Sequence, residues 1–156
     1  MATLRIVFVL GLIFGMFGDS ISQTYRINKP PISGITKVNK LANDNFLVNN
    51  PKKGIDITSD STYVYSSVNG RVLRDFQVVN SYIVLIKNKD LVWAYVNLDS
   101  TFVHKGDSIS LNQRIGRLQY DSGLHKYNLN LQLYKDKKLL STEQTLKILN
   151  AKIQKK

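Results

Sequence analysis

Three side-chain amides that alternate with leucines are the residues best placed to do chemistry. Asn128, Asn130 and Gln132 stand at every second position of a leucine-rich segment. In a β-strand alternate side chains share a face, so the leucines point into a core and the amides point the other way. Asparagine is depleted in strands, and each amide offers two donors and an acceptor. The stripe indicates either a polar groove that hydrogen-bonds a ligand or an ordinary solvent-exposed strand face.

The composition is that of a small, basic domain without disulfides. The chain has 156 residues, a length typical of one domain or of one domain with a short arm. Its apolar content of 43% is ordinary for a globular protein with a real core. The net charge of +11 favours anionic partners, although a basic surface also serves solubility alone. The sequence contains no cysteine, which excludes disulfides and lipoprotein anchoring.

Residues 1–22 have the pattern of a cleaved signal peptide. Arg5 supplies a positive charge, residues 6–17 are apolar apart from two glycines, and Ser20 and Ser22 precede the expected cleavage point. This apolar run is shorter than the about 20 residues that a membrane-spanning helix needs. An uncleaved anchor and a buried helix are the alternatives. We expect an exported protein in the periplasm or at the cell surface, with no stable transmembrane segment after cleavage and with envelope partners rather than nucleic acid.

The rest of the chain divides into an arm, a folded domain and a tail. Residues 23–45 contain two adjacent prolines and several asparagines, which favours an extended arm. Residues 46–150 are expected to form the domain, and residues 151–156 a basic tail.

Within the domain, short β-branched and aromatic runs separated by Gly, Asn and Asp predict strands. These runs cover residues 62–65, 71–79, 82–86, 91–96, 108–111, 114–120 and 127–134. Asn69-Gly70 predicts a hairpin turn between the first two strands, and 82–86 with 91–96 predicts a central hairpin. Only the segment from Thr142 onward predicts a helix. The fold class is therefore mainly β, an antiparallel sandwich or barrel-like sheet with a short C-terminal helix.

Six segments of the domain form an ordered set of motifs. They are a Gly-x-Asp segment, the strand and turn after it, the tryptophan-containing strand, the Gly-Asp and Ile-Gly turns, and the amide stripe, at residues 54–57, 64–72, 93–98, 103–109, 112–116 and 128–132. In this order along residues 50–149, these segments resemble the lysostaphin-type (LytM, M23) peptidoglycan endopeptidases. The resemblance implies a β domain of the lysostaphin, or duplicated-hybrid, type.

The positions where that family carries histidine hold other residues here. By the resemblance, Lys52 and Asn130 replace zinc-binding histidines, Asn97 and Asn128 replace catalytic histidines, and Asp56 is the metal ligand that remains. Zinc prefers imidazole, thiolate or carboxylate ligands, and an amide does not titrate near neutral pH. We therefore expect no metal, no cofactor and no peptidase activity.

Neither remaining histidine changes this expectation. His104 and His125 match no ligand position of the family, and both are expected at the surface. A residual metallo-endopeptidase stays the least favoured alternative.

The resemblance implies a non-catalytic role at the cell envelope, either peptidoglycan binding or activation of a cell-wall hydrolase. The expected groove is lined by Lys52, Asp56, Asn97, Asn128, Asn130 and Gln132. We expect Lys52 to contact Asp56 in place of a metal, the alternative being that Lys52 points to solvent. Lys53, Arg71 and Lys105 would draw in anionic polymer. The alternative function is an accessory or scaffold subunit of an envelope complex that leaves the groove unused.

Overall fold

The computed structural model describes five parts of the chain. These are Tyr25–Arg26, residues 31–32, Lys37–Asn39, residues 54–149 and Lys152–Ile153. The expected signal peptide lies outside the described residues, as do Lys52, Lys53 and most of the expected arm and tail. Two short strands, β1 (Tyr25–Arg26) and β2 (Lys37–Asn39), fall within the segment expected as an extended arm. No helix in the described parts is long and apolar enough to cross a membrane.

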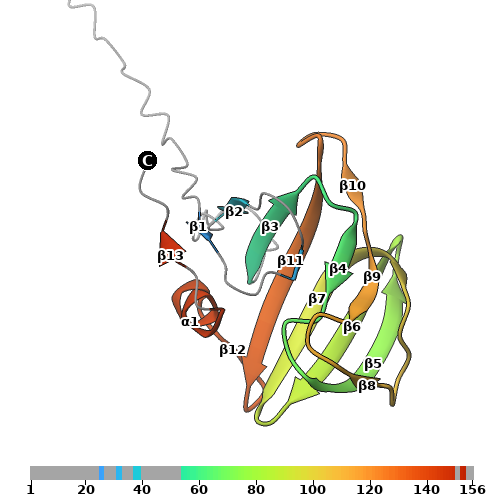
Figure 1. Cartoon of the computed structure of the whole chain (residues 1–156), viewed down its shortest axis with the longest axis vertical. Coiled ribbons are helices and arrows are strands. Elements are labelled where there is room, and N and C mark those ends of the chain that lie inside the picture. The colour runs from blue at the N-terminus through green and yellow to red at the C-terminus, as the bar shows by residue number, and fades with distance from the viewer. Residues whose placement is uncertain (1–24, 27–30, 33–36, 40–53, 150–151, 154–156) are drawn as a thin grey trace, which may run out of the picture.

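An open antiparallel sheet forms the body of the domain (Figure 1). Its strands follow the order β2-β3-β11-β7-β6-β5-β8, with β10 and β12 also pairing with β11. The strands of this path are β2 (Lys37–Asn39), β3 (Ile55–Ser59), β11 (Lys126–Lys135), β7 (Leu91–Thr101), β6 (Ser81–Asn88), β5 (Gly70–Val78) and β8 (Ser108–Ile109). The shorter partners are β10 (Tyr120–Asp121) and β12 (Lys138–Leu139). The fold is thus mainly β and antiparallel, as the sequence predicts.

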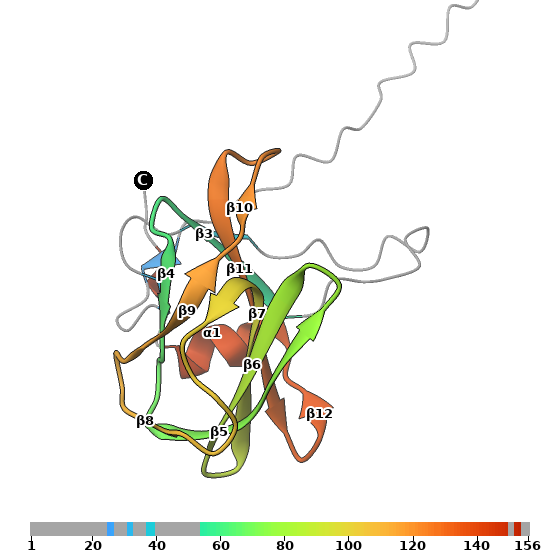
Figure 2. The ribbon, with the colours of Figure 1, turned by 90° about the vertical axis from the view of Figure 1, so that its right-hand side faces the viewer.

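A second, smaller layer covers the core side of this sheet. It consists of β4 (Tyr63–Tyr65) and β9 (Arg114–Leu118), which lie side by side in both views (Figures 1 and 2). β9 also pairs with the far end of β7, so the chain passes continuously from the main sheet into this layer. Val64 and Ile115 belong to the same fully buried cluster as the three leucines of β11. The predicted inward orientation of Leu129, Leu131 and Leu133 is confirmed, since each is 0% exposed.

The central hairpin predicted from the sequence is present. β6 and β7 pair across the turn at Lys89 and Asp90, with Asn88 opposite Leu91. Both strands are apolar on both faces, which is typical of strands covered on two sides. The last predicted strand is also present as β11, and it lies between β3 and β7 in the path.

The hairpin turn predicted at Asn69-Gly70 is wrong. β4 pairs with β9, and β5 pairs with β6 and β8 instead. The chain between β4 and β5 crosses toward the 110–113 turn, where Asn112 N donates to Ser66 O. Gly70 serves a different purpose, because a Cβ at this position would lie 2.5 Å from the carbonyl oxygen of Lys87 in β6. The glycine therefore permits close strand approach and is not a turn residue.

The single described helix, α1 (Thr142–Ile148), follows the sheet and packs against the core through Leu146 and Leu149. Ser141 caps it: its hydroxyl accepts from Gln144 N, while the Gln144 side chain accepts from Ser141 N. Such a capping box satisfies two otherwise unpaired backbone donors. Apart from this helix, the short β1 (Tyr25–Arg26) and β13 (Lys152–Ile153) pair with each other near the ends of the chain.

Candidate functional site

Two of the three amides in the stripe are buried, and Gln132 is half-buried. Asn128 and Asn130 are each 7% exposed, and Asp56 on the neighbouring strand is 6% exposed. The register of β11 against β3 places Asn130 opposite Asp56 and Asn128 opposite Thr58. On its other side Asn130 lies opposite Val96 of β7. Burial rules out an ordinary solvent-exposed strand face, because polar groups are buried only where they are paired or used.

A continuous hydrogen-bond chain runs along this face of β11. Asn130 Nδ2 donates to Asp56 Oδ1 at 2.8 Å, and Gln132 Nε2 donates to Asn130 Oδ1 at 2.7 Å. Tyr134 Oη donates in turn to Gln132 Oε1 at 2.6 Å. Side chains at alternate strand positions are close enough for such contacts. Three of the predicted groove residues are therefore brought together, and Tyr134 joins them.

Asn128 is buried differently from Asn130. Its Oδ1 has no hydrogen-bond partner within the described parts of the chain. A buried amide oxygen without a partner costs about 1–3 kcal/mol. This atom is therefore the point of the stripe with an unfilled capacity to accept a hydrogen bond.

Asn97 has a backbone reason to be asparagine. It has φ of 70°, in the left-handed region that asparagine tolerates better than most residues. It also lies at an irregularity in β7, because the register against β6 shifts between Tyr82 and Val84. Its carbonyl oxygen accepts from Gln119 N at 3.1 Å. The position of Asn97 in the sheet is thus determined by its backbone, and a role for its side chain stays a prediction.

Arg71, His104 and His125 are not part of the hydrogen-bond chain along β11. The Lys52–Asp56 contact stays a prediction, since Lys52 is outside the described residues. Arg71 Nε donates to Gly106 O at 2.9 Å, at the β5–β8 edge of the sheet. His104 and His125 are both exposed, as expected.

An apolar cavity continues the groove beyond the amides, and sequence reasoning missed it. Its volume is about 510 Å³, and its polar lining comes from Gln132, Tyr134, Asp90, Asp136 and Lys137. The apolar lining comes from β5, β6 and β7, namely Leu73, Phe76, Ile83, Leu85, Val92, Ala94 and Val96. The signal was present in the sequence, because the runs at 82–86 and 91–96 are apolar at successive positions. Such a run supplies apolar side chains to both faces of a sheet, not to the core alone.

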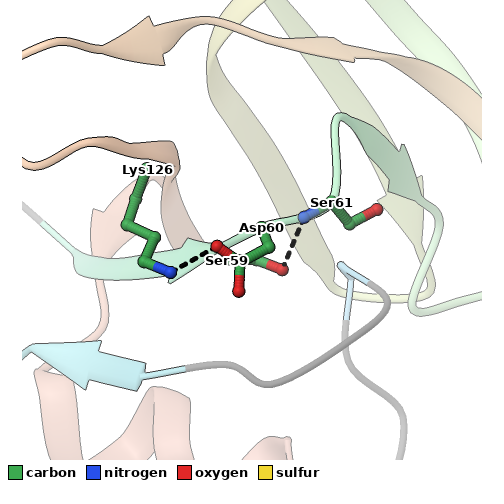
Figure 3. Close-up of polar contacts among 4 residues, drawn as sticks. All are labelled: Ser59, Asp60, Ser61 and Lys126. Carbon is green, nitrogen blue, oxygen red and sulfur yellow. Dashed lines mark hydrogen bonds and ion pairs between the residues drawn. The ribbon is translucent and has the colours of Figure 1, made fainter.

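The far end of the β3–β11 pair is closed by polar contacts (Figure 3). Lys126, at the start of β11, forms an ion pair with Asp60, just after β3. Ser61 N donates to Ser59 Oγ at 3.0 Å in the same turn. The two charged side chains are 44% and 70% exposed, so the pair contributes about 0–1 kcal/mol. It marks the end of the strand pair and does not line the groove.

Comparison with known proteins assigns the fold to a family. The sequence profile of peptidase family M23 matches residues 50–142. The chain belongs to peptidase family M23. A search of curated protein sequences found no match.

Solved structures agree with this M23 assignment. A chain of the crystal structure of the SpoIIIAH and SpoIIQ complex superposes with a TM-score of 0.60 at 20% identity, covering 78% of this chain and 99% of that one. A zinc-containing peptidase from Vibrio cholerae superposes with a TM-score of 0.59 at 18% sequence identity, covering 76% of this chain and 40% of the peptidase chain. Lysostaphin superposes with a TM-score of 0.55 at 14% sequence identity, covering 83% of this chain and 56% of the lysostaphin chain. At these identities the likeness concerns the fold alone.

The zinc ion of such a peptidase does not fit the donor set of this M23 domain. Asn130 turns an N–H toward Asp56, where a metal ligand would have to present a lone pair. A neutral amide is a poor zinc ligand beside imidazole, thiolate and carboxylate. Within residues 54–149 and the short described strands, no three His, Cys, Asp or Glu side chains come together. Asp56, Asn130 and Gln132 form hydrogen bonds with one another instead.

Proposed function

We propose that this M23 domain is catalytically inactive and holds a peptide-containing ligand in its groove at the cell envelope. The ligand is peptidoglycan or a segment of a cell-wall hydrolase that the domain activates. The observation that carries the proposal is the donation of Asn130 Nδ2 to Asp56 Oδ1. In this hydrogen bond Asn130 presents an N–H, not a lone pair, to the carboxylate that the resemblance makes a metal ligand.

The chemistry of the replaced residues supports inactivity. Metal-assisted hydrolysis needs a bound water whose pKa falls to about 7 and a metal that polarises the scissile carbonyl. It also needs a group that accepts and returns a proton near neutral pH. By the resemblance, Asn97 and Asn128 stand at the catalytic positions, and their amides do not titrate there.

The shape of the groove supports a peptide ligand. Amide side chains pair well with peptide N–H and C=O groups, which offer one donor and one acceptor per residue. The adjoining cavity of about 510 Å³ has an apolar lining that suits an aliphatic or aromatic side chain. Sites that combine an apolar cavity with a few placed polar groups are typical of specific binding.

The envelope location is part of the same proposal. It rests on the signal-peptide pattern of residues 1–22 and on the net charge of +11. A basic exported protein meets anionic cell-wall polymers. Lys52, Asp56, Asn97, Asn128, Asn130 and Gln132 are the groove residues proposed to contact the ligand or each other.

A second candidate function is that of an accessory subunit in an envelope complex. It is favoured by the likeness to a chain crystallised in the SpoIIIAH and SpoIIQ complex, 99% of which this chain covers. In that case a partner protein would occupy a surface of the domain while the groove stays unused.

A pulldown with purified peptidoglycan tests groove binding. The protein is expected to be retained, and Asn128→Ala/Asn130→Ala to abolish retention. Lys89→Gln/Lys147→Gln, which removes two exposed charges elsewhere, is the matched control and is expected to retain binding. If only the lysine variant lost retention on peptidoglycan, retention would be due to positive charge and not to the groove. Absence of retention in the unmodified protein, with a partner co-purifying from the native envelope, would favour the accessory subunit.

Metal analysis tests inactivity. The unmodified protein is expected to carry no stoichiometric zinc after dialysis against a trace of the metal. Lys52→His/Asn130→His completes a two-histidine, one-aspartate ligand set by the resemblance and is expected to bind one zinc ion. Stoichiometric zinc in the unmodified protein would overturn the proposal, whatever the double variant does.

A further inference from the structure

A second polar surface lies on the far side of the core from the groove, on the outer face of β4 and β9. Val64 and Ile115 of these strands point into the core, so their neighbours along each strand point outward. Five exposed or half-buried side chains gather there. They are Tyr63, Tyr65, Phe102, Arg114 and Arg117, and we name this set the arginine–tyrosine platform.

A β-bulge creates the platform. Tyr63 lies opposite Arg117, but Tyr65 lies opposite Arg114, because the register shifts between Val64 and Tyr65. With regular pairing, Arg114 and Arg117 would point to opposite faces, since they are three residues apart. The extra residue in β9 brings both arginines to the outer face. Bulges commonly re-aim side chains in this way at functional sites.

The arginines are held in place by the rings. Arg114 Cζ lies 4.1 Å from the ring centroid of Tyr63 and 6.0 Å from that of Tyr65. Arg117 Cζ lies 5.5 Å from the Tyr63 centroid. The Tyr63 ring thus orients both guanidinium groups through cation–π contacts. Stacking occupies the flat face of a guanidinium and leaves its N–H edges pointing outward.

The donors on those edges are largely unused. Arg117 Nη2 makes one long hydrogen bond to Tyr63 Oη, 3.4 Å. In the described parts of the chain, no carboxylate forms an ion pair with Arg114 or Arg117. Arg117 also lowers the pKa of the Tyr63 hydroxyl, through this hydrogen bond first and its charge second. Two pre-oriented cations with free donor edges therefore face solvent beside each other.

From this geometry we propose that the arginine–tyrosine platform binds the oxyanions of an acidic polysaccharide. A guanidinium edge matches carboxylate and phosphate oxygens in a bidentate way. The aromatic neighbours favour an anion carried on a sugar, because the C–H faces of a sugar ring can pack on an exposed ring such as Phe102, which is 44% exposed. The groove would then hold a peptide while the opposite face holds an anionic glycan.

The probes are soluble polymers of defined charge. We would measure binding of the full chain to phosphorylated dextran, to polygalacturonate, to poly-glutamate and to neutral dextran, at low and at physiological salt. Binding to one of the first two is expected, and the stronger one identifies phosphate or carboxylate as the natural anion. Binding to neither, or to poly-glutamate alone, would overturn the proposal.

Two pairs of variants separate the platform from overall charge. Arg114→Gln/Arg117→Gln is expected to weaken binding about tenfold or more, since hydrogen bonds to charged groups contribute about 1.5–3 kcal/mol. Lys89→Gln/Lys147→Gln removes the same charge from other exposed positions and is expected to weaken it much less. Equal losses in the two pairs would overturn the proposal in favour of diffuse attraction.

A charge-conserving variant gives the sharpest comparison. Arg114→Lys/Arg117→Lys keeps both charges but loses the planar donor edge, so most of the affinity is expected to be lost. Full retention would contradict guanidinium recognition. These side chains are exposed, so thermal unfolding is expected to be unchanged. Because peptidoglycan retention through the groove is measured separately, either proposal can fail while the other stands.

Discussion

At the scale of single residues, the two asparagines of β11 illustrate how one residue type serves two purposes. Asn130 is a link in a chain of hydrogen bonds that ends on Asp56. Asn128, two positions earlier on the same face, has a buried Oδ1 without a partner in the described parts of the chain. A buried polar atom without a hydrogen-bond partner lowers the stability of the fold. Such atoms are typical of ligand-binding sites, where the ligand supplies the missing hydrogen bond.

Leucine substitutions are expected to separate these two purposes. Asn128→Leu removes an unsatisfied oxygen, so the free energy of unfolding should stay level or rise by about 1 kcal/mol. Asn130→Leu removes the hydrogen bonds of Asn130 with Asp56 Oδ1 and Gln132 Nε2 and should lower the free energy of unfolding by about 2–3 kcal/mol. Urea denaturation measures both. A loss in Asn128→Leu as large as in Asn130→Leu would show that Asn128 stabilises the fold and is not reserved for a ligand.

At the scale of elements, turn residues with positive φ shape the hairpins. Val79, in the turn between β5 and β6, has φ of 54° and is 85% exposed. A β-branched residue is strained in this region, and few residues other than glycine and asparagine avoid the strain. Since no packing compensates a side chain that faces solvent, the strain is a direct cost to stability.

Relieving that strain is expected to stabilise the protein. Val79→Asn should raise the free energy of unfolding by about 1 kcal/mol, because asparagine tolerates the left-handed conformation. Val78→Asn, one residue earlier inside β5, is the control and should lower it, because asparagine is unfavourable in a strand. Thermal denaturation distinguishes the two, and the same sign for both would contradict the explanation from backbone conformation.

The approach of β3 to β11 depends on a glycine just before β3. Gly54 has φ of 87°, and a Cβ there would lie 2.3 Å from Leu131 O. Gly54→Ala should therefore cost more than about 2 kcal/mol. Gly106→Ala, with φ of 96° and no atom within 4 Å of the added Cβ, should cost about 1 kcal/mol from conformation alone. Similar losses in the two variants would mean that close packing of the strands contributes little.

These elements also show what the sequence predicts well. Alternation around Leu129 and Leu131 predicts β11 and its buried face, because side-chain period and burial are local properties. Asn69-Gly70 misleads because the same dipeptide serves a tight turn or a close strand contact, and only long-range pairing with β6 decides between them. The apolar cavity could not be predicted from the sequence for a similar reason. A run of apolar residues does not indicate what covers the second face of the strand.

At the scale of the whole molecule, the core contains a titratable group. Tyr95 is 0% exposed, and its Oη accepts a hydrogen bond from Ser67 N at 3.0 Å. Burial raises the pKa of the Tyr95 hydroxyl above its ordinary value, although the hydrogen bond opposes this. The folded state therefore favours the neutral phenol, whereas the unfolded state ionises near pH 10.

Stability is consequently expected to fall at alkaline pH. Since the pKa of Tyr95 is higher in the folded state, its neutral phenol contributes fully to the free energy of unfolding below about pH 10. This contribution decreases as the pH rises toward the pKa of the folded state. Titration of tyrosinate absorbance should show one of the eight tyrosines ionising only with unfolding, while Tyr63, whose pKa is lowered by Arg117, ionises early. Tyr95→Phe should remove the late component, and its persistence would contradict the assignment.

The hydrogen-bond chain along β11 is a one-way arrangement. Tyr134, Gln132 and Asn130 each donate toward Asp56, so the hydroxyl proton of Tyr134 is directed inward and its oxygen faces the cavity as an acceptor. A guest that bonds to the Tyr134 oxygen must supply an N–H or O–H. A guest carbonyl would instead bond to the second N–H of the Gln132 or Asn130 amide. The domain would thereby distinguish the two directions in which a peptide can enter, reading the polarity of the strand as well as its shape.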